Sequence, residues 1–396
     1  MKTLFITGGA GFIGSNFLIR QINGGNTRVI NYDKLTYAGN LDTLHSIESN
    51  SNYYFVEGDI CDQGLVQKTL TENKVDSIVN FNGKEFLGRC LESLKHQTFS
   101  NFKTVVVDNF SHDGSVDEIE DLFPSVEVVR LEKNIGFSAA NNYAVKQAKG
   151  FQWVALLNPD TIVEPDWLSK LHIAAEENPR YNFFGSHLTK QDSLGRLDGT
   201  GDIYHLCGLA WRRDHGVSES QISRSAGEIF SPCAAAAMYR RDIFLDIGGF
   251  DERFFCYFED VDLAFRLRLM GHRCLYVPNA KVEHFGSAIS GRQSDFVVYH
   301  GHRNMVWTYV KNMPSLLLWY GLPQHILANL AALIYFSLTG QAGPIFKAKR
   351  DALLGLGKTI EQRKLIQKNK RVSSKELKKI IAAGWFRPYL KNRELM

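Results

Sequence analysis

The stretch VDSIVNFNGKEFL, residues 75–87, reads as a short apolar strand, a polar turn and the start of a helix. Two α/β patterns meet at this point of the chain. The residues before it and the residues after it each form a series of strands and helices, and the strand at residues 75–81 would complete either series. The sheet that takes this strand therefore decides the fold.

At 396 residues the chain is long enough for two domains. Its six cysteines are scattered and form no C-x-x-C pair, which predicts reduced thiols. The start, MKTLFITGG, lacks the apolar run and the small-residue cleavage site of a signal peptide. We therefore expect the protein in the cytoplasm, and we expect no nucleic acid among its partners.

The C-terminal part of the chain differs from the rest in two ways: it is strongly basic, and it contains the most apolar segment. Residues 345–396 contain 15 Lys and Arg against four Asp and Glu, so this tail carries +11 and the rest of the chain −7. Residues 315–339 are the most apolar stretch, interrupted near the middle by Pro323, Gln324, His325 and Asn329. An interfacial anchor, a spanning helix and a buried core helix are all open for this stretch. The neighbouring Lys and Arg favour an anchor bound peripherally to the inner face of the cell membrane.

Residues 1–74 carry the pattern of a truncated Rossmann-like lobe. TLFITGGAGFIGSNF is a strand, a glycine cluster and the start of a helix, at the spacing that brings a pyrophosphate onto a helix N-terminus. The next strand, RVINYD, ends in Asp33, where a carboxylate can accept a hydrogen bond from a ribose hydroxyl. A third strand, YYFVEGDI, completes the order β-α-β-α-β.

These motifs resemble the N-terminal part of the dTDP-glucose 4,6-dehydratase family, over about the first 81 residues. That family's catalysis depends on a Tyr-x-x-x-Lys pair, and no tyrosine of this chain has a lysine four residues later. Losing the second half of the sheet also removes the nicotinamide side of the crevice. Two interpretations are open: a residual NAD site formed by Gly8, Gly11, Gly14 and Asp33, which could bind the adenosine side without hydride chemistry, and a structural remnant that has lost its use. The lost half of the sheet favours the remnant, with a vestigial NAD site.

From residue 75 the alternation of strands and helices restarts and continues to about residue 310. Polar residues follow these strands, and ligands of parallel α/β domains bind at the carboxyl ends of the strands. Asp108, after VVV, can bond a nucleoside base or a ribose. Asn158 and Asp160 follow ALL, and a carboxylate there can hold the divalent cation that accompanies a diphosphate.

The segment FEDVDLAFRLRLMG carries a second group of acids. If a helix begins near Glu259, then Glu259, Asp260 and Asp262 crowd its first turn, where the macrodipole favours negative charge. Helix capping would explain one of them, whereas group transfer to an alcohol needs a base for the acceptor proton. His284 ends CLYVPNAKVEH and is either a surface histidine or, with the acids near it, a metal ligand.

Six blocks, in this order, resemble family two glycosyltransferases with the GT-A fold, of the bacterial rhamnosyltransferase-like kind: NFNG, VVVDNFSHDGS, NIGFSAANN, LLNPDT, FEDVDLAFRLRLMG and HFGSAIS. The resemblance implies a GT-A domain over residues 75–312 and a helical, membrane-associating extension over residues 313–396. It also implies a nucleoside pocket, lined or shaped by Asn80, Asn82, Asp108, Asn134, Gly136, Asn142 and Asn158.

The same resemblance implies the reacting groups. Asn158-Pro159-Asp160 takes the position of the family's D-x-D motif, so that Mg²⁺ or Mn²⁺ would be held by Asp160 and His284. Asp260 matches the catalytic base, and Glu259 and Asp262 would position it or the acceptor.

We therefore expect an α/β chain in which a truncated Rossmann-like lobe precedes a GT-A glycosyltransferase domain and a helical extension. The expected activity is inverting transfer of a sugar, rhamnose from dTDP-L-rhamnose or a sugar from a UDP donor. The acceptor would be a saccharide or lipid-linked hydroxyl in cell-surface polysaccharide synthesis. The alternative is a dehydratase-like nucleotide-sugar-binding protein that is inactive as a dehydratase. We assign residues 75–81 to the transferase sheet, with Asp76 at the strand's exposed end.

Overall fold

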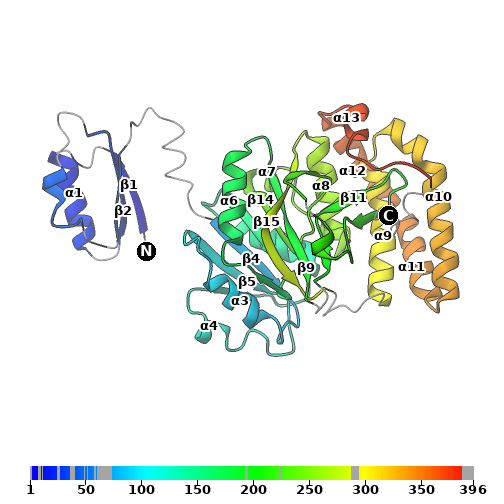
Figure 1. Cartoon of the computed structure of the whole chain (residues 1–396), viewed down its shortest axis with the longest axis horizontal. Coiled ribbons are helices and arrows are strands. Elements are labelled where there is room, and N and C mark those ends of the chain that lie inside the picture. Colours follow the sequence, from blue (N-terminus) through cyan, green and yellow to red (C-terminus); the bar gives the residue numbers. More distant parts are fainter. Residues whose placement is uncertain are drawn as a thin grey trace. The chain divides into compact units, whose positions relative to one another are not determined.

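The computed structural model describes residues 2–7, 10, 12–24, 27–35, 41–48, 50, 52–57, 59, 74–191, 195–222, 224–286 and 294–385. These residues form two compact units, one made mainly of residues 1–73 and the other mainly of residues 74–149 and 153–396 (Figure 1). Two of the expected site glycines, Gly8 and Gly11, lie outside the described residues.

The N-terminal unit is a small parallel sheet. Its strands are β1 (Lys2–Thr7), β2 (Thr27–Asp33) and β3 (Tyr53–Glu57), in the order β1-β2-β3. Helix α1 (Phe12–Asn23) joins the first two strands, and the 3-10 helix η1 (Leu41–Leu44) follows the second, where an α-helix was expected. A small apolar core, including Leu18, Ile22, Val29, Leu44 and Ile47, holds the unit together.

The second unit takes the contested strand. Strand β4 (Lys74–Asn80) lies between β5 (Phe102–Asp108) and β7 (Trp153–Leu157) and is parallel to both. The assignment of residues 75–81 to the transferase sheet is thus confirmed. Asp76, the third residue of β4, is in register with Thr104 on one side and Ala155 on the other. Its expected exposure at the strand end stays a prediction.

The large sheet is mixed. Its order is β13-β15-β9-β14-β7-β4-β5-β6, with β10 beside β9 and β8 beside β15. Strand β6 (Glu127–Arg130) continues the parallel part, and β14 (Ala236–Arg240) runs antiparallel between β7 and β9 (Phe183–Lys190). The remaining strands are β8 (Thr161–Val163), β10 (Leu197–Gly199), β13 (Gly227–Ile229), β15 (Cys274–His284) and a separate pair, β11 (Asp202–Tyr204) with β12 (Ala210–Arg212).

Helices cover this sheet and supply its core. Those of the domain are α3 (Leu87–Lys95), α4 (Ile119–Leu122), α5 (Gly136–Gln147), α6 (Trp167–Glu177), α7 (Arg241–Asp246) and α8 (Glu259–Leu269), with 3-10 turns η2 (Glu219–Gln221) and η3 (Glu252–Phe254). Leu91 of α3 and Trp167 and Leu171 of α6 pack with Ile78 and Val106 of the sheet in one buried cluster. This packing leaves the carboxyl ends of β4, β5 and β7 at one edge, where the polar residues follow.

The C-terminal part is helical, as expected. It consists of α9 (Asp295–Asn312), α10 (Ser315–Leu338), α11 (Ala342–Leu354), α12 (Leu356–Asn369) and α13 (Ser374–Lys378). Of the described helices, α10 is the one whose length and composition would allow it to cross a membrane. Only 28% of its most apolar window is buried, whereas the core-helix alternative would have it mostly buried.

Candidate active site

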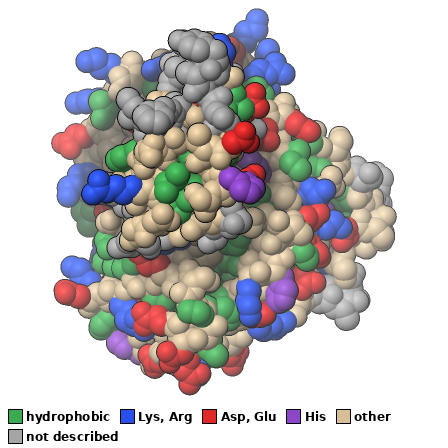
Figure 2. Space-filling view, turned by 90° about the vertical axis from the view of Figure 1, so that its left-hand side faces the viewer, with side chains coloured by type: hydrophobic (Ala, Val, Ile, Leu, Met, Phe, Trp, Pro, Cys, Tyr) green, Lys and Arg blue, Asp and Glu red, His purple; other side chains and the backbone are tan. Residues whose placement is uncertain are grey.

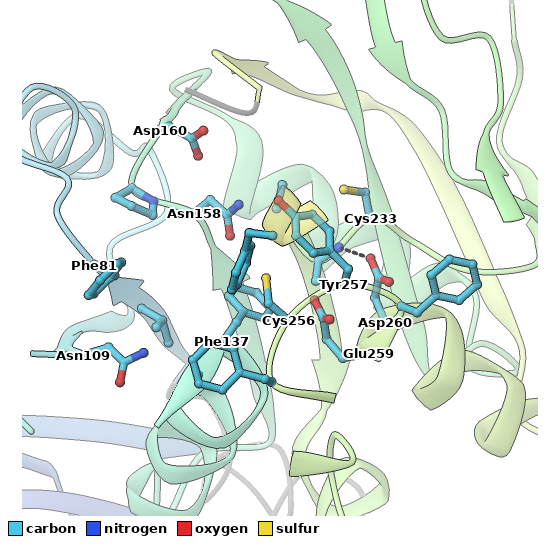
Figure 3. A pocket seen from close by; sticks show the side chains of 18 of the residues that line it. Phe81, Asn109, Phe137, Asn158, Asp160, Cys233, Cys256, Tyr257, Glu259 and Asp260 are labelled. Carbon is cyan, nitrogen blue, oxygen red and sulfur yellow. Dashed lines mark hydrogen bonds between the residues drawn. The ribbon is translucent and has the colours of Figure 1, made fainter. Parts of the chain in front are cut away.

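A cavity of about 630 Å³ opens at the carboxyl edge of the parallel strands. In Figure 3, Asn158 and Asp160 lie on one side of it, toward Phe81 and Asn109, and Glu259 and Asp260 lie on the other. Seven of the expected site residues line it, and they come from four separate parts of the chain: Asn134, Gly136, Asn158, Asp160, Glu259, Asp260 and His284.

The strand-end residues Asn80, Asn82 and Asp108 are not among the lining side chains. Asn80 Nδ2 donates to Asp108 Oδ1 at 3.0 Å and to Ser115 Oγ at 2.8 Å. The backbone N–H of Ser111 donates to Asp108 Oδ2 at 3.1 Å, and the Asn82 side chain accepts from the N–H of His112 at 3.0 Å. These three side chains therefore shape the loop after β5 beside the cavity.

Asn109, which sequence reasoning missed, connects this loop to the cavity wall. Its side chain donates to Asn134 Oδ1 at 3.0 Å and accepts from the N–H of Ile135 at 2.9 Å. Asn134 Oδ1 also accepts from the N–H of Gly136 at 2.9 Å. The signal for Asn109 was its position in VVVDN, one residue after the expected Asp108.

Gly136 cannot carry a side chain in this wall. Its φ is +84°, and a Cβ atom would lie 2.5 Å from Phe255 Cδ2. Glycine therefore lets α5 begin in contact with the segment before α8.

Asn142, further along α5, does not line the cavity. It donates to the carbonyl of Phe250 at 2.9 Å and accepts from the N–H of the same residue at 2.8 Å. This pair of bonds fixes the loop before η3, so Asn142 acts on the cavity through that loop.

Asn158, Asp160 and His284 form the candidate metal edge. His284 Nε2 lies 3.5 Å from Asp160 Oδ1, a separation that two ligands of one cation at about 2.1 Å can have. Asn158 Oδ1 is buried and has no hydrogen-bond partner among the described residues. No group of three or more His, Cys, Asp or Glu in the described part of the chain could hold a metal ion. The 3.5 Å separation of Asp160 and His284 and the unpartnered Asn158 Oδ1 fit a cation that would take its remaining ligands from a bound diphosphate.

Asp198 on β10 orients His284, and sequence reasoning missed it. Its Oδ2 lies 2.7 Å from His284 Nδ1 and also accepts from the cavity-lining Arg212. Burial alone would raise the pKa of Asp198, but bonds from His215 and His284 and the Arg212 charge hold it well below its usual range. Burial alone would lower the pKa of His284, but Asp160 and Asp198 raise it. An ionised Asp198 thus keeps a proton on Nδ1 and turns Nε2 toward Asp160.

Glu259, which is buried, and Asp260, which is partly exposed at the cavity, form an acidic pair at the start of α8, where a helix start was expected. Asp260 accepts from the N–H of Ala234 at 3.1 Å and from that of Val261 at 2.8 Å. Burial raises the pKa of Asp260, partly offset by these donors and by Arg212. Burial and the neighbouring Asp260 raise the pKa of Glu259 well above its usual range, and Glu259 Oε2 has no partner in the described structure.

Asp262 points elsewhere. It is fully buried and bonds Arg266 at 2.8 Å, Asn312 at 2.7 Å and Lys311 at 2.8 Å. It does not line the cavity and instead ties α8 to α9.

The segment before the acidic pair is strained and is held by α9. Phe255, Tyr257 and Phe258 all have φ near the left-handed value, at 67°, 68° and 67°, which is costly for residues other than glycine. Asn304 Nδ2 lies within hydrogen-bond distance of three carbonyl oxygens in this turn, those of Phe254, Cys256 and Tyr257, at 2.7–3.0 Å. The contacts with Asn304 keep the turn in the conformation that presents Glu259 and Asp260.

Of the expected NAD residues, Gly14 lies within α1 and Asp33 ends β2. Both carboxylate oxygens of Asp33 are engaged by backbone: Oδ2 accepts from the N–H of Ala10 at 2.7 Å and Oδ1 from that of Leu35 at 2.9 Å. Asp33 thus joins the end of β2 to Ala10 and to Leu35.

Comparison with known proteins finds a matching family for the N-terminal part of the chain and another for the larger unit. Residues 77–248 match the family described as glycosyl transferase family 2, and residues 5–102 match the GDP-mannose 4,6 dehydratase family, so the two matches overlap at residues 77–102. A dTDP-glucose 4,6-dehydratase of Xanthomonas campestris pv. campestris is 48% identical over 92 residues, 23% of this chain. The chain spans only 26% of that enzyme's length.

The larger unit has glycosyltransferase relatives. An N-acetylglucosaminyl-diphospho-decaprenol L-rhamnosyltransferase of Mycobacterium tuberculosis is 28% identical over 234 residues, 54% of this chain and 76% of the relative. The crystal structure of GalNAc-T7 with UDP, GalNAc and Mn²⁺ aligns with a TM-score of 0.51 at 18% identity, over 62% of this chain and 49% of that one, which shows the fold. Residues 77–248 are thus a family 2 glycosyltransferase domain with a GT-A-like sheet, behind a dehydratase-like fragment.

Proposed function

We propose that this family 2 domain transfers a sugar from a nucleoside-diphospho-sugar to an acceptor hydroxyl, with inversion at the anomeric carbon. One observation carries the proposal: Asp260 and the Asn158–Asp160–His284 edge line the same cavity. A base and a site for a diphosphate are the two parts that such a transfer needs.

Asp260 is the proposed base. A carboxylate oxygen takes the proton of the acceptor hydroxyl while the acceptor oxygen bonds to the anomeric carbon from the face opposite the diphosphate. The anomeric C–O bond breaks, and its electron pair leaves with the nucleoside diphosphate. Burial favours this role, because it raises the pKa of Asp260 and so makes its carboxylate a stronger base.

The metal edge would stabilise the leaving group. A bound Mg²⁺ or Mn²⁺ supplies positive charge against the diphosphate. Asp160 and His284 would hold it, and Asp198 keeps His284 turned toward the edge. Asn158 Oδ1 has no partner among the described residues and would accept a hydrogen bond from a hydroxyl of the donor or ligate the cation. Glu259, whose pKa is raised well above its usual range by burial and by the neighbouring Asp260, would stay protonated and donate to the acceptor.

Rhamnose is the proposed sugar and dTDP-L-rhamnose the proposed donor, with UDP sugars as the alternative. The support is the relative named as an L-rhamnosyltransferase and the N-terminal resemblance to dTDP-glucose 4,6-dehydratase, an enzyme that acts on dTDP-bound sugars. That relative's name also supports a lipid-linked acceptor, and with it a role in cell-surface polysaccharide synthesis at the cytoplasmic face of the membrane.

A second candidate function is a nucleotide-sugar-binding protein with the remains of a dehydratase. It is favoured by the 48% identity of the N-terminal segment, but the chain has no Tyr-x-x-x-Lys pair for dehydration. This candidate predicts NAD retention without turnover, whereas the transferase predicts release of a nucleoside diphosphate.

A donor screen tests the proposal. The full chain, with Mn²⁺, is incubated with dTDP-L-rhamnose, UDP-N-acetylglucosamine and GDP-mannose, and released nucleoside diphosphate is measured with and without a saccharide acceptor. We expect release from dTDP-L-rhamnose, and an Asp260→Asn sample is the matched blank. No release above that blank from any donor would refute the transferase and leave the binding protein.

A further inference from the structure

Helix α10 has two different sides. Its buried residues recur every three or four positions and face the rest of the unit: Leu317, Gly321, Gln324, His325 and Ala328. Its exposed apolar residues follow the same spacing on another side, with Leu316 78% and Leu338 82% exposed: Leu316, Trp319, Leu327, Leu330, Ile334 and Leu338. We call this second set the apolar face of α10. In Figure 1, α10 lies on the outside of the helical extension, next to α11.

The buried side is fixed to the protein body by specific contacts. A Cβ atom on Gly321 would lie 2.6 Å from the carbonyl oxygen of Leu206, so the helix packs directly on that backbone. Tyr309 Oη donates to the carbonyl of Leu318 at 2.6 Å, and the Tyr309 ring stacks on His325 at 3.9 Å. His325 Nδ1 also lies 2.7 Å from the carbonyl oxygen of Cys207.

These contacts argue against a helix that crosses a bilayer. Crossing would remove Gln324 and His325 from their partners and expose them to hydrocarbon, where unpaired polar groups are costly. Lying in the membrane plane keeps them paired and covers only the apolar face. A helix with one such face is suited to the interface between headgroups and acyl chains.

Charge and aromatic residues indicate an anionic bilayer rather than another apolar partner. Trp319 and Tyr320 are about 70% exposed, and aromatic residues of this kind favour the membrane interface. Lys378 Nζ lies 5.6 Å from the centre of the Tyr320 ring, which brings a cation to the apolar face. The tail of residues 345–396 carries +11, whereas the face drawn in Figure 2 shows Lys and Arg interspersed with Asp and Glu.

The end of α10 also lies near the cavity. Gln341 Nε2 donates to Asp295 Oδ1 at 3.1 Å, which joins the residues after α10 to the start of α9. The next residue, Phe296, lines the cavity and is 40% exposed. A bilayer on the apolar face would therefore lie close to the rim where an acceptor enters.

We propose that the apolar face of α10 lies in the plane of an anionic membrane surface without crossing it, and brings the Phe296 rim of the cavity to a lipid-linked acceptor. The choice of acceptor rests on the proposed function. Membrane binding itself needs no sugar donor and is measured separately.

Flotation of the purified full chain with vesicles tests the binding. We expect the protein to float with vesicles of phosphatidylcholine and phosphatidylglycerol, and less with phosphatidylcholine alone. The double variant Leu327→Glu/Leu330→Glu should bind at least about tenfold more weakly. Leu122→Glu, at a 62% exposed leucine of α4, is the matched control and should float like the wild type. Donor hydrolysis in solution should be unchanged in both variants, which reports that they are folded.

Trypsin added outside the vesicles tests the arrangement in the plane. We expect cleavage within residues 345–379 to be similar with and without detergent. A tail that is protected until detergent is added would mean that α10 crosses, and would overturn the proposal. Failure of the wild type to float, or equal flotation of the double variant, would also overturn it. So would a wild type that dimerises without vesicles and becomes monomeric in the double variant, because the apolar face would then bind a second copy. None of these outcomes bears on sugar release from the donor.

Discussion

The two sheets of this chain end their second strand in the same way but differ in what faces that end. Asp33 closes β2 of the small sheet and Asp108 closes β5 of the large sheet, and both carboxylates are engaged by neighbouring N–H groups. In the large sheet, α8 and α9 add the acidic pair and the strained turn opposite the strand ends. In both sheets the acid at the strand end therefore shapes a loop. In the proposed mechanism, sugar transfer also requires the groups that α8 and α9 add to the large sheet.

We expect the largest effect from a substitution in the acidic pair of α8. Asp260→Asn keeps the size of the side chain but cannot accept a proton, so we expect kcat to fall by about 10²- to 10⁴-fold while the donor still binds. Kinetics with a saccharide acceptor and calorimetry with the free nucleotide measure the two parts. Retained turnover would mean that Asp260 is not the base, and that the acidic pair is not what distinguishes the large sheet from the small one.

Glu259→Gln is the matched control, because a glutamine resembles the protonated acid that the raised pKa of Glu259 favours. We expect a smaller loss than for Asp260→Asn, and equal losses would mean that the two acids act together as the base.

The pH dependence tests the same assignment. In the wild type the rate should drop as pH falls through the raised pKa of Asp260, at a pH above the usual aspartate value of about 3.9. This acid limb should be absent from the residual rate of Asp260→Asn.

The next effect concerns the strained turn. Asn304→Ala removes contacts with three carbonyl groups, and a misplaced Asp260 can cost up to about 100-fold in kcat. Asn329→Ala on α10 is the control, because it removes an asparagine of the same helical part that bonds His325 and Lys349 instead. Similar rates in the two variants, at similar thermal stability, would mean that Asn304 does not position the acidic pair.

A third prediction concerns the metal edge. Activity should be lost in EDTA and restored by Mn²⁺, and Asp198→Asn should weaken Mn²⁺ binding in the presence of nucleoside diphosphate by about 10- to 100-fold. Electron paramagnetic resonance of bound Mn²⁺ measures this without turnover. Asp214→Asn, at a carboxylate that bonds Thr200 and Arg224, is the control. Activity that is indifferent to the chelator would remove Asp160 and His284 from the ligand set.

The smallest expected effect is in the N-terminal unit. Asp33→Ala removes the bond to the N–H of Ala10, and we expect no change in the rate of nucleoside diphosphate release. Titration of the full chain with NAD⁺ should show no binding at micromolar concentrations. Tight NAD⁺ binding that Asp33→Ala abolishes would instead mean that the small sheet keeps a working cofactor site.

Local patterns in the sequence predicted the alternation of strands, the helix start at Glu259 and the sheet that takes β4. Local patterns also singled out Asp160, Asp260 and His284, and the family resemblance predicted that these residues from distant parts of the chain share one site. Local patterns could not predict which of the side chains at the strand ends point into the cavity. Asn80 and Asp108 have the same local setting as Asn158 and Asp160, but bond the next loop instead.

The residues that were missed act over long distances in the sequence. Asp198 reaches His284 across 86 positions, and Asn304 reaches Tyr257 across 47. Neither has a motif of its own, because its role depends on how β10 and α9 pack against the cavity. Asp262 was expected beside Asp260 because both lie in one helical turn, but they point in different directions from the helix.

The position of β4 has a consequence for how such a chain can arise. The ladders on both sides of β4 are made by backbone groups, which every residue type except proline supplies equally. Exchanging the first residues of this strand for those of another protein therefore leaves the transferase sheet intact. The small sheet is affected by such a join, because among the described residues its β1 edge has no neighbouring strand, whereas a complete sheet of its kind would provide one. A junction inside a central strand is thus compatible with a complete sheet on one side of the join and a three-stranded sheet on the other.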